Sequence, residues 1–160
     1  MLRLEKITGK NVWDLLGLRV EEDQRGFVAS NEISVIEAYI ALTRGGHAYP
    51  FGLYDGDRAV GFVMIGYGTD EDWEEPPEIA KNNYSLWRLM IDRRYQRRGY
   101  GRAAVELALD FIRTMPCGQA AWCWVSYMPE NTAARRLYRS FGFRENGERD
   151  GEELVALLRL

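Results

Sequence analysis

The chain has 160 residues, of which 46% are hydrophobic and 12% aromatic, and its formal net charge is −3. This length suits one domain, residues 1–160, that buries roughly two thirds of its unfolded surface, and the composition excludes a disordered chain. No apolar run approaches the roughly 20 residues of a membrane span, so we expect a cytoplasmic protein with no membrane partner. The acidic balance also argues against nucleic acid as a partner.

Metal-dependent chemistry is not expected from the few residues that could support it. Cys117 and Cys123 form neither a disulfide framework nor a CxxC pair, and His47 is the only histidine. A structural zinc site needs about four such ligands, and a Ser-His-Asp triad needs a histidine base. We therefore predict no metal site and a structural or solvated role for His47.

The first 46 residues carry a helical pattern of apolar side chains. Residues 10–20 predict one short helix. A second helix is predicted to begin at Ser34, which forms a capping box with Glu37, and to end before the pair Gly45-Gly46. The side chains that this second helix would bury are Val35, Ile36, Tyr39, Ile40 and Leu42.

The remaining chain alternates strands and helices. The turn Asp55-Gly56-Asp57 between two apolar runs predicts a β-hairpin, and the polar, acidic, proline-containing residues 69–83 predict a loop or a short helix. The further elements are a strand at 84–92, a helix at 99–115, a strand at 119–127, a helix at 132–141 and a hairpin at 143–160.

The order ααβββαβαββ indicates an α/β fold, a three-layer α/β/α sandwich around a mixed sheet, with a parallel βαβ unit in residues 84–127.

Five arginines and two glycines gather in residues 93–109, RRYQRRGYGRAAVELAL, at the start of a helix. A P-loop is excluded because no lysine precedes Ser or Thr. A dinucleotide fingerprint is met formally by residues 99–104, but residues 111–129 hold no acidic ribose-binding residue. An anion cradle explains the stretch better, because glycine N–H groups, the helix N-terminus and Arg97, Arg98 and Arg102 could all bind a pyrophosphate.

Residues 96–101, QRRGYG, match the Q/R-x-x-G-x-G/A signature, so the chain resembles the GCN5-related N-acetyltransferase (GNAT) superfamily. Residues 131–143, NTAARRLYRSFGF, are similar to the C-terminal helix of that family. The resemblance implies that acetyl-CoA lies between two splayed parallel strands, with its pyrophosphate on residues 96–102. The cofactor-binding residues implied are Met90, Ile91, Asp92, Gln96, Arg97, Arg98, Gly99, Tyr100, Gly101, Arg102 and Asn131.

Tyr138 is the candidate catalytic residue, a general acid for the departing thiolate. It follows Asn131 by two helical turns, so both side chains can face one cleft, and the resemblance implies the same role. The alternative is that Tyr138 belongs to a core stripe with Ala134, Leu137 and Phe141. The general base is open, because the strand at 84–91 lacks the family's glutamate. The alternatives are a water chain to Glu21, Glu22 or Glu74 and the capture of neutral amine.

Two acidic clusters, residues 21–23 and 70–78, suit an amine acceptor when combined with aromatic side chains. The candidate substrate-binding residues are Glu21, Glu22, Phe27, Trp73, Glu74, Tyr84 and Trp87. Residues 24–39 also resemble the bacterial spermine/spermidine (diamine) acetyltransferase branch, which implies a polyamine acceptor. A protein or peptide amine, an aminoglycoside, or a non-catalytic acyl-CoA- or polyamine-binding module are the alternatives. The closing hairpin could pair across a homodimer.

Overall fold

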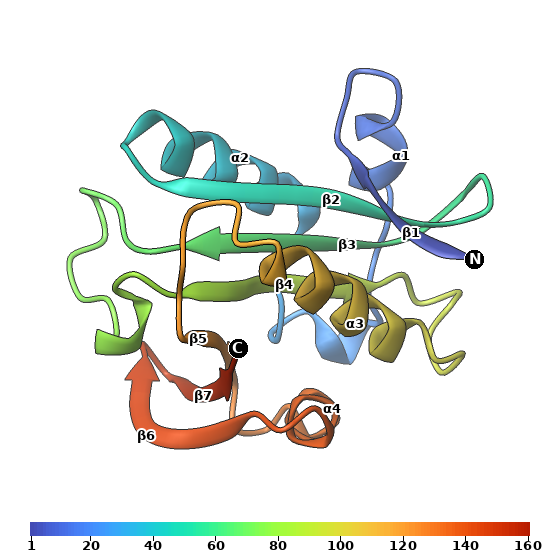
Figure 1. Ribbon diagram of the computed structural model, residues 1–160. Helices are drawn as coiled ribbons and strands as arrows, with labels where there is room; N and C mark the ends of the chain where they lie inside the picture. The colour runs from blue at the N-terminus through green and yellow to red at the C-terminus, as the bar shows by residue number, and fades with distance from the viewer.

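The computed structural model describes residues 1–160 and contains seven strands, four α-helices and two short 3-10 helices (Figure 1). The strands are β1 (Leu2–Lys6), β2 (His47–Asp55), β3 (Arg58–Tyr67), β4 (Tyr84–Ile91), β5 (Trp122–Tyr127), β6 (Arg144–Asp150) and β7 (Glu153–Arg159). The helices are α1 (Val12–Leu16), α2 (Asn31–Thr43), α3 (Tyr100–Arg113) and α4 (Thr132–Ser140), and the 3-10 helices are η1 (Glu22–Gln24) and η2 (Glu78–Ala80).

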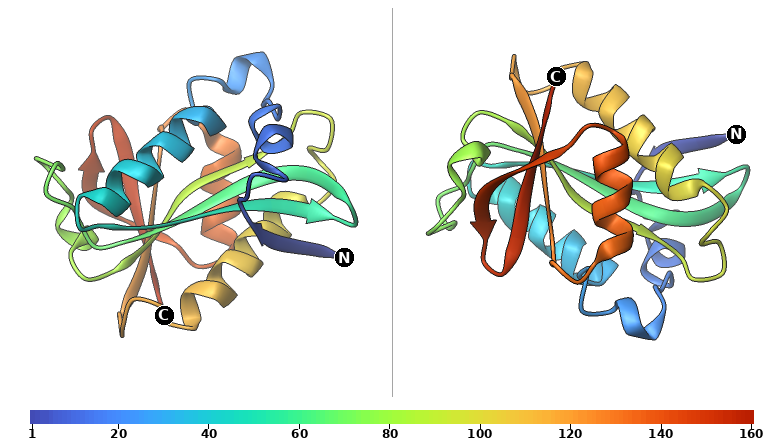
Figure 2. Two further views of the ribbon diagram at one scale, coloured as in Figure 1. Left: turned by 90° about the horizontal axis from the view of Figure 1, so that it is seen from above. Right: turned by 90° about the horizontal axis from the view of Figure 1, so that it is seen from below.

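All seven strands form one sheet in the order β1-β2-β3-β4-β5-β7-β6. Helices α1 and α2 cover one face of this sheet, and α3 and α4 cover the other (Figure 2). Only the β4–β5 pair is parallel, with α3 as its crossover. The expected α/β class, the mixed sheet and the parallel βαβ unit are therefore confirmed.

The N-terminal strand β1 was not among the expected elements. It pairs antiparallel with β2 at the edge of the sheet, from Leu2 opposite Asp55 to Lys6 opposite Phe51. Leu2 and Leu4 alternate with polar residues and pack on the core from half-buried positions. Five residues with two apolar side chains give only a weak local signal, and the pairing with β2 is what makes them a strand.

The start of α2 differs from the prediction. Ser30, not Ser34, is the N-cap, because its hydroxyl accepts the Ile33 N–H at 3.3 Å. Ser34 is fully buried inside the helix, and the carboxylate of Glu37 pairs with Arg88 at 2.8 Å. Ser30 and Ser34 are two candidate N-cap residues four positions apart. Tertiary packing buries Ser34, so the helix begins after Ser30.

The buried face of α2 also differs from the one expected, and of the five expected side chains only Val35 packs, partly buried, on the core. Small and polar side chains, among them Ser34, Ala38 and Ala41, face the sheet. Ile36, Tyr39, Ile40 and Leu42 are instead exposed, by 58%, 69%, 44% and 57%. Small residues let the helix pack closely on the strands, so the large side chains are left in solvent.

The splay between β4 and β5 creates the central cleft. Their parallel pairing ends after Tyr84 opposite Cys123 and Ser85 opposite Trp124. In β4, Trp87 is an extra residue between the pairs Leu86–Ile65 and Arg88–Met64, which is a β-bulge. A bulge bends its strand, so β4 turns away from β5 at this point.

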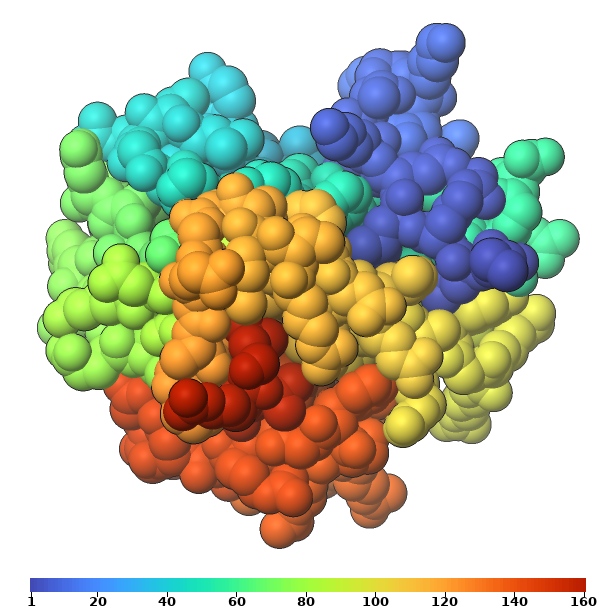
Figure 3. Space-filling view, in the orientation of Figure 1, coloured from blue at the N-terminus to red at the C-terminus, as the bar shows by residue number.

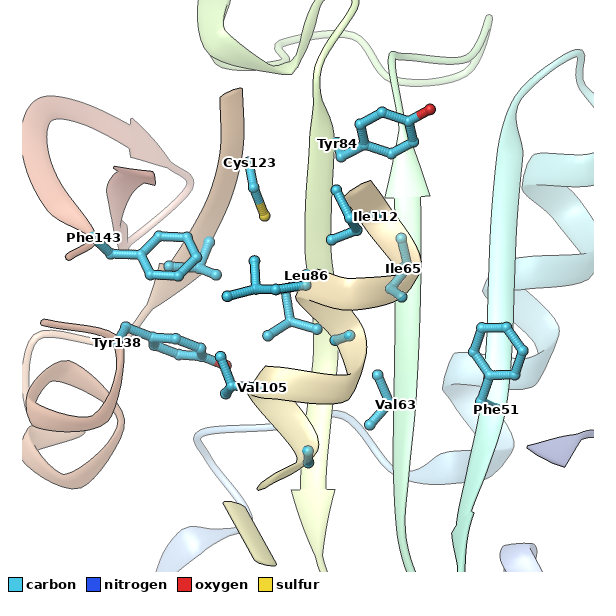
Figure 4. Packing of buried hydrophobic residues seen from close by; sticks show 14 of the residues in the cluster. Phe51, Val63, Ile65, Tyr84, Leu86, Val105, Ile112, Cys123, Tyr138 and Phe143 are labelled. Carbon is cyan, nitrogen blue, oxygen red and sulfur yellow. The ribbon is translucent and has the colours of Figure 1, made fainter. Parts of the chain in front are cut away.

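The core on the α3 side joins the two splayed halves. Val105 of α3 lies beside Tyr138, whereas Ile112 of α3 lies near Tyr84 and Ile65, with Leu86 of β4 between the two groups (Figure 4). The end of the chain, dark red in Figure 3, packs among the segments of α3 and α4, and the Leu160 N–H donates to the Ala121 carbonyl at 2.9 Å. None of the helices is both long and apolar enough to cross a membrane.

Candidate active site

A cleft of about 800 Å³ opens where β4 and β5 separate. Its lining comes from the second half of β4, the glycine turn before α3, the end of β5, α4, the segment between α1 and α2, and the β6–β7 turn. Beyond Ser85, the edge of β4 that faces β5 carries no strand partner. The free backbone groups of this edge can therefore pair with an extended ligand.

The turn between β4 and α3 is built to bind an anion. Gly99 is the N-cap of α3 in the left-handed conformation, with φ 83°, and Arg97 is also left-handed, with φ 61°. No backbone N–H from residue 96 to residue 102 has a hydrogen-bond partner within the protein, and the first turn of α3 has no acidic residue. Unpaired N–H groups at a helix N-terminus attract negative charge, as a pyrophosphate requires.

Two polar side chains hold this turn in place. Gln96 donates from Nε2 to the Ile91 carbonyl at 3.0 Å and to Gln24 Oε1 at 2.7 Å, which joins the turn to β4 and to the segment after α1. Asp92 is 2% exposed and accepts the Arg19 N–H at 2.9 Å and Arg94 Nε at 2.7 Å. Burial alone would raise the pKa of Asp92, but Arg94 and the backbone donors lower it. Asp92 therefore positions the strand end and does not line the cleft.

The three arginines expected at the pyrophosphate are placed differently from one another. Arg97 lines the cleft. The guanidinium of Arg98 lies 5.7 Å from the ring centroid of Tyr95, and that of Arg102 lies 4.8 Å from the ring of Phe141, with Glu106 3.5 Å away. Arg98, Gly99 and Arg102 are thus beside the cleft but are not part of its lining, whereas Met90, Ile91, Gln96, Tyr100, Gly101 and Asn131 are.

Tyr138 and Asn131 reach the cleft from α4. Asn131 is the N-cap of α4, with its Oδ1 accepting the Ala134 N–H at 3.2 Å. Tyr138 is 7% exposed, stacks on Tyr127 at 6.1 Å and meets Phe143 edge-on at 5.5 Å. Burial raises the pKa of Tyr138 well above that of a free phenol. Tyr138 thus belongs both to the core stripe and to the cleft, and its hydroxyl has no hydrogen-bond partner in the protein.

The β6–β7 turn brings three carboxylates to the same cleft, those of Asp150, Glu152 and Glu153. Burial raises the pKa of Asp150 and of Glu153, and Ser126 Oγ donates to Glu153 Oε1 at 3.4 Å. Sequence reasoning missed these residues. The stretch DGEE at the turn of the expected closing hairpin was the available signal, but nothing local connects that turn with Tyr138.

The residues expected to bind the acceptor are divided between several places. Phe27 and Trp87 line the cleft, and Trp73 and Trp87 line a second cleft of about 370 Å³. Glu21, Glu22 and Glu74 line neither.

Tyr84 does not belong to an acceptor site. It is fully buried in the core, where its hydroxyl donates to the Gly118 carbonyl at 2.9 Å (Figure 4). Tyr84 was expected at the acceptor site as an aromatic residue near the acidic loop, but residues of α3 such as Ile112 and the segment at Cys117 and Gly118 cover it.

An extended ligand with a pyrophosphate group fits this cleft. The free edge of β4, the row of unpaired N–H groups and the largely apolar walls suit the pantetheine arm and the diphosphate of coenzyme A. The fold and the cleft define a coenzyme A-dependent transferase.

Residues 14–143 match the model of the acetyltransferase (GNAT) family, and the chain belongs to that family. It is an N-acetyltransferase that uses acetyl-CoA as co-substrate, as expected from the glycine turn. It is 29% identical to the spermine/spermidine N(1)-acetyltransferase of Bacillus subtilis over 96% of each chain. It is 27% identical to the ribosomal protein bS18-alanine N-acetyltransferase of Escherichia coli, over 74% of this chain and 80% of the other. The fold is similar to that of the aminoglycoside acetyltransferase AAC(6')-Ib in complex with coenzyme A, with a TM-score of 0.75, 14% identity and coverage of 99% and 95%.

Proposed function

We propose that this protein acetylates a primary amine of a polyamine such as spermidine or spermine. The observation that carries the proposal is the convergence of Asp150, Glu152 and Glu153 on the cleft that Tyr138 also lines. Carboxylates at the mouth of a cleft select a cationic amine through charge. The relative from Bacillus subtilis, named for spermine and spermidine, supports the same acceptor class.

Tyr138 is the proposed general acid. Acetyl-CoA supplies an activated thioester carbonyl and a thiol leaving group. The raised pKa of Tyr138 keeps its hydroxyl protonated at neutral pH. With no protein acceptor for that proton, the hydroxyl is free to donate to the sulfur as the carbon–sulfur bond breaks.

Glu153 is the proposed proton acceptor for the substrate ammonium group, with Asp150 beside it. A carboxylate whose pKa is raised by burial is a stronger base than an exposed one, and it can take a proton from an ammonium group held against it. This assignment replaces the glutamate that β4 lacks, since β4 carries no carboxylate between Tyr84 and Ile91. The amine then forms its bond to the acetyl carbon as a neutral nucleophile.

Turnover with a panel of acceptors tests the proposal. Release of free thiol from acetyl-CoA would be followed with spermidine, spermine, an aminoglycoside and peptides with a free α-amino group. We expect the highest kcat/KM for the polyamines. Activity on peptides alone would overturn the acceptor assignment. If the protein bound acetyl-CoA but released no thiol with any of the amines, it would be a non-catalytic acyl-CoA-binding module.

A further inference from the structure

A second cleft meets the first at the bulge of β4. It has a volume of about 370 Å³ and lies between the C-terminal half of α2, the end of β3 and the acidic loop after it. Six lining residues are common to the two clefts, namely Leu86, Trp87, Arg88, Ser126, Asp150 and Glu153. A ligand that reacts in the first cleft can therefore extend into the second.

The second cleft is strongly acidic. Five carboxylates line it, those of Glu37, Asp70, Asp72, Asp150 and Glu153, against the single guanidinium of Arg88, which gives a formal charge of −4 when all are ionised. Three of the five lie outside the first cleft. One of them, Asp72, is paired at 3.0 Å with Arg44, an exposed residue outside the lining. Asp70 has no ion pair and accepts only the Asp72 N–H, at 2.9 Å.

The walls of the second cleft are aromatic. Tyr67, Trp73, Trp87 and Trp124 all line it, and the rings of Trp73 and Trp124 lie 6.1 Å apart. Indole faces bind ammonium groups, and they also cover the methylene segments between such groups. Carboxylates interleaved with indoles match a thin chain that alternates charge and hydrocarbon.

The junction between the clefts carries a cation of the protein itself. Arg88 donates from one terminal nitrogen to Glu37 at 2.8 Å, and its Nε is buried without a hydrogen-bond partner. Its positive charge also lowers the pKa of Asp150 and Glu153, against the raising effect of burial. The carboxylates at this junction are therefore already arranged around a cation.

We propose that the second cleft binds the distal ammonium group of the polyamine while the reacting amine lies in the first cleft. The inference rests on the proposed function. It identifies the residues that make the enzyme prefer a polyamine over a simple monoamine. A monoamine reaches only the first cleft, whereas a linear polycation spans both and gains the charge of Asp70 and the ring of Trp73.

The test compares spermidine with butylamine as acceptors for variants of the second cleft. Asp70→Asn and Trp73→Leu should each lower kcat/KM for spermidine by about threefold to tenfold and leave that for butylamine unchanged. Arg44→Gln, which frees Asp72, should raise kcat/KM for spermidine and leave that for butylamine unchanged. Glu75→Gln is the matched control, since it lies in the same loop but outside both clefts.

The outcomes separate the two proposals. If the wild-type protein acetylates spermidine but the ratio of the two kcat/KM values stays constant in all three variants, the second cleft is not the distal site and the proposed function stands. An equal loss with both acceptors would also overturn the distal site. If the wild-type protein acetylates peptides and not spermidine, the proposed function fails first.

Discussion

At the scale of single residues, Tyr138 has both a structural role and a proposed chemical one. Its ring is packed between Tyr127 and Phe143, and its hydroxyl is unpaired at the cleft. Tyr138→Phe keeps the ring and removes only the proton, so we expect kcat to fall by about 100-fold or more with the affinity for coenzyme A nearly unchanged. Thiol-release kinetics and calorimetric titration with coenzyme A measure the two quantities.

The control for that variant is Tyr39→Phe, which removes a hydroxyl that is exposed on α2 and should change neither quantity. Unchanged turnover in Tyr138→Phe would remove the residue from the mechanism. A loss of coenzyme A affinity equal to the loss of turnover would instead show a packing defect.

Arg97 and Arg98 are adjacent, but the structure separates them. Arg97 lines the cleft, and Arg98 lies over Tyr95. Since a charge-assisted hydrogen bond contributes roughly 1.5–3 kcal/mol, Arg97→Gln should raise the KM for acetyl-CoA by about tenfold or more, and Arg98→Gln should raise it much less. Steady-state kinetics at saturating amine decides between them, and the reverse ranking would contradict the placement of the two side chains.

The turn carboxylates couple stability to pH. A carboxyl group whose folded-state pKa is raised stabilises the fold at low pH, and this stabilisation is lost as the pH rises through that pKa. The ionised side chain of Glu153 therefore lowers the free energy of unfolding at pH 7. Glu153→Gln should therefore raise the Tm at pH 7, with the gain disappearing below pH 4.5, the ordinary pKa of a glutamate carboxyl, while turnover falls.

Thermal unfolding between pH 4 and pH 8 checks this prediction, with Glu152→Gln as the exposed neighbouring control. A gain of 1 kcal/mol would move the Tm of a chain of this size by about 2–4 °C. A lower Tm at pH 7 in Glu153→Gln would mean that the charge of Glu153 is satisfied in the fold.

At the scale of elements, α2 shows how a helix can be identified correctly and oriented wrongly. The apolar residues that suggested its core stripe are largely exposed, and Ala38 is 2% exposed against the sheet. Periodicity locates a helix, but it identifies the buried face only when the large side chains are the ones that pack. Here the close approach to β2 and β3 requires small ones.

Two substitutions on α2 test this orientation. Ile36→Gln, at an exposed position, should change the free energy of unfolding by less than about 0.5 kcal/mol. Ala38→Leu should destabilise the protein by about 1–3 kcal/mol, because no space is left between the helix and the sheet. Urea unfolding measures both effects. A large effect of Ile36→Gln would mean that Ile36 is buried and would contradict the orientation of α2.

At the scale of the whole molecule, the cleft separates two halves of one sheet. The β4 side carries the glycine turn, and the β5 side carries α4 and the terminal hairpin. A ligand that contacts both halves stabilises the folded state by mass action. At a concentration 100 times its Kd, coenzyme A should add about 2.7 kcal/mol, which raises the Tm by roughly 5–10 °C.

Differential scanning fluorimetry with increasing coenzyme A measures this shift. Arg97→Gln should need a higher coenzyme A concentration for the same rise, and Arg98→Gln should behave much more like the wild-type protein. No shift at saturating coenzyme A would contradict binding across the two halves.

The sequence by itself determined the features that depend on near neighbours. The Asp-Gly turn between β2 and β3, the left-handed Gly99 before α3 and the strand–helix–strand order around it all follow from backbone preferences and periodicity within a few residues. Those short-range signals predicted an anion-binding turn, and the resemblance of residues 96–101 and 131–143 to the GNAT family implied the co-substrate.

Only the tertiary structure decided which side chains meet. Tyr84 is buried because α3 and the segment after it pack over this part of the sheet, and Asp150 and Glu153 reach the cleft of Tyr138 because β7 pairs with β5. The splay itself depends on the bulge at Trp87, which is defined by its partners in β3. Contacts between distant segments select among locally equivalent patterns, and the proposed acceptor site consists almost entirely of such contacts.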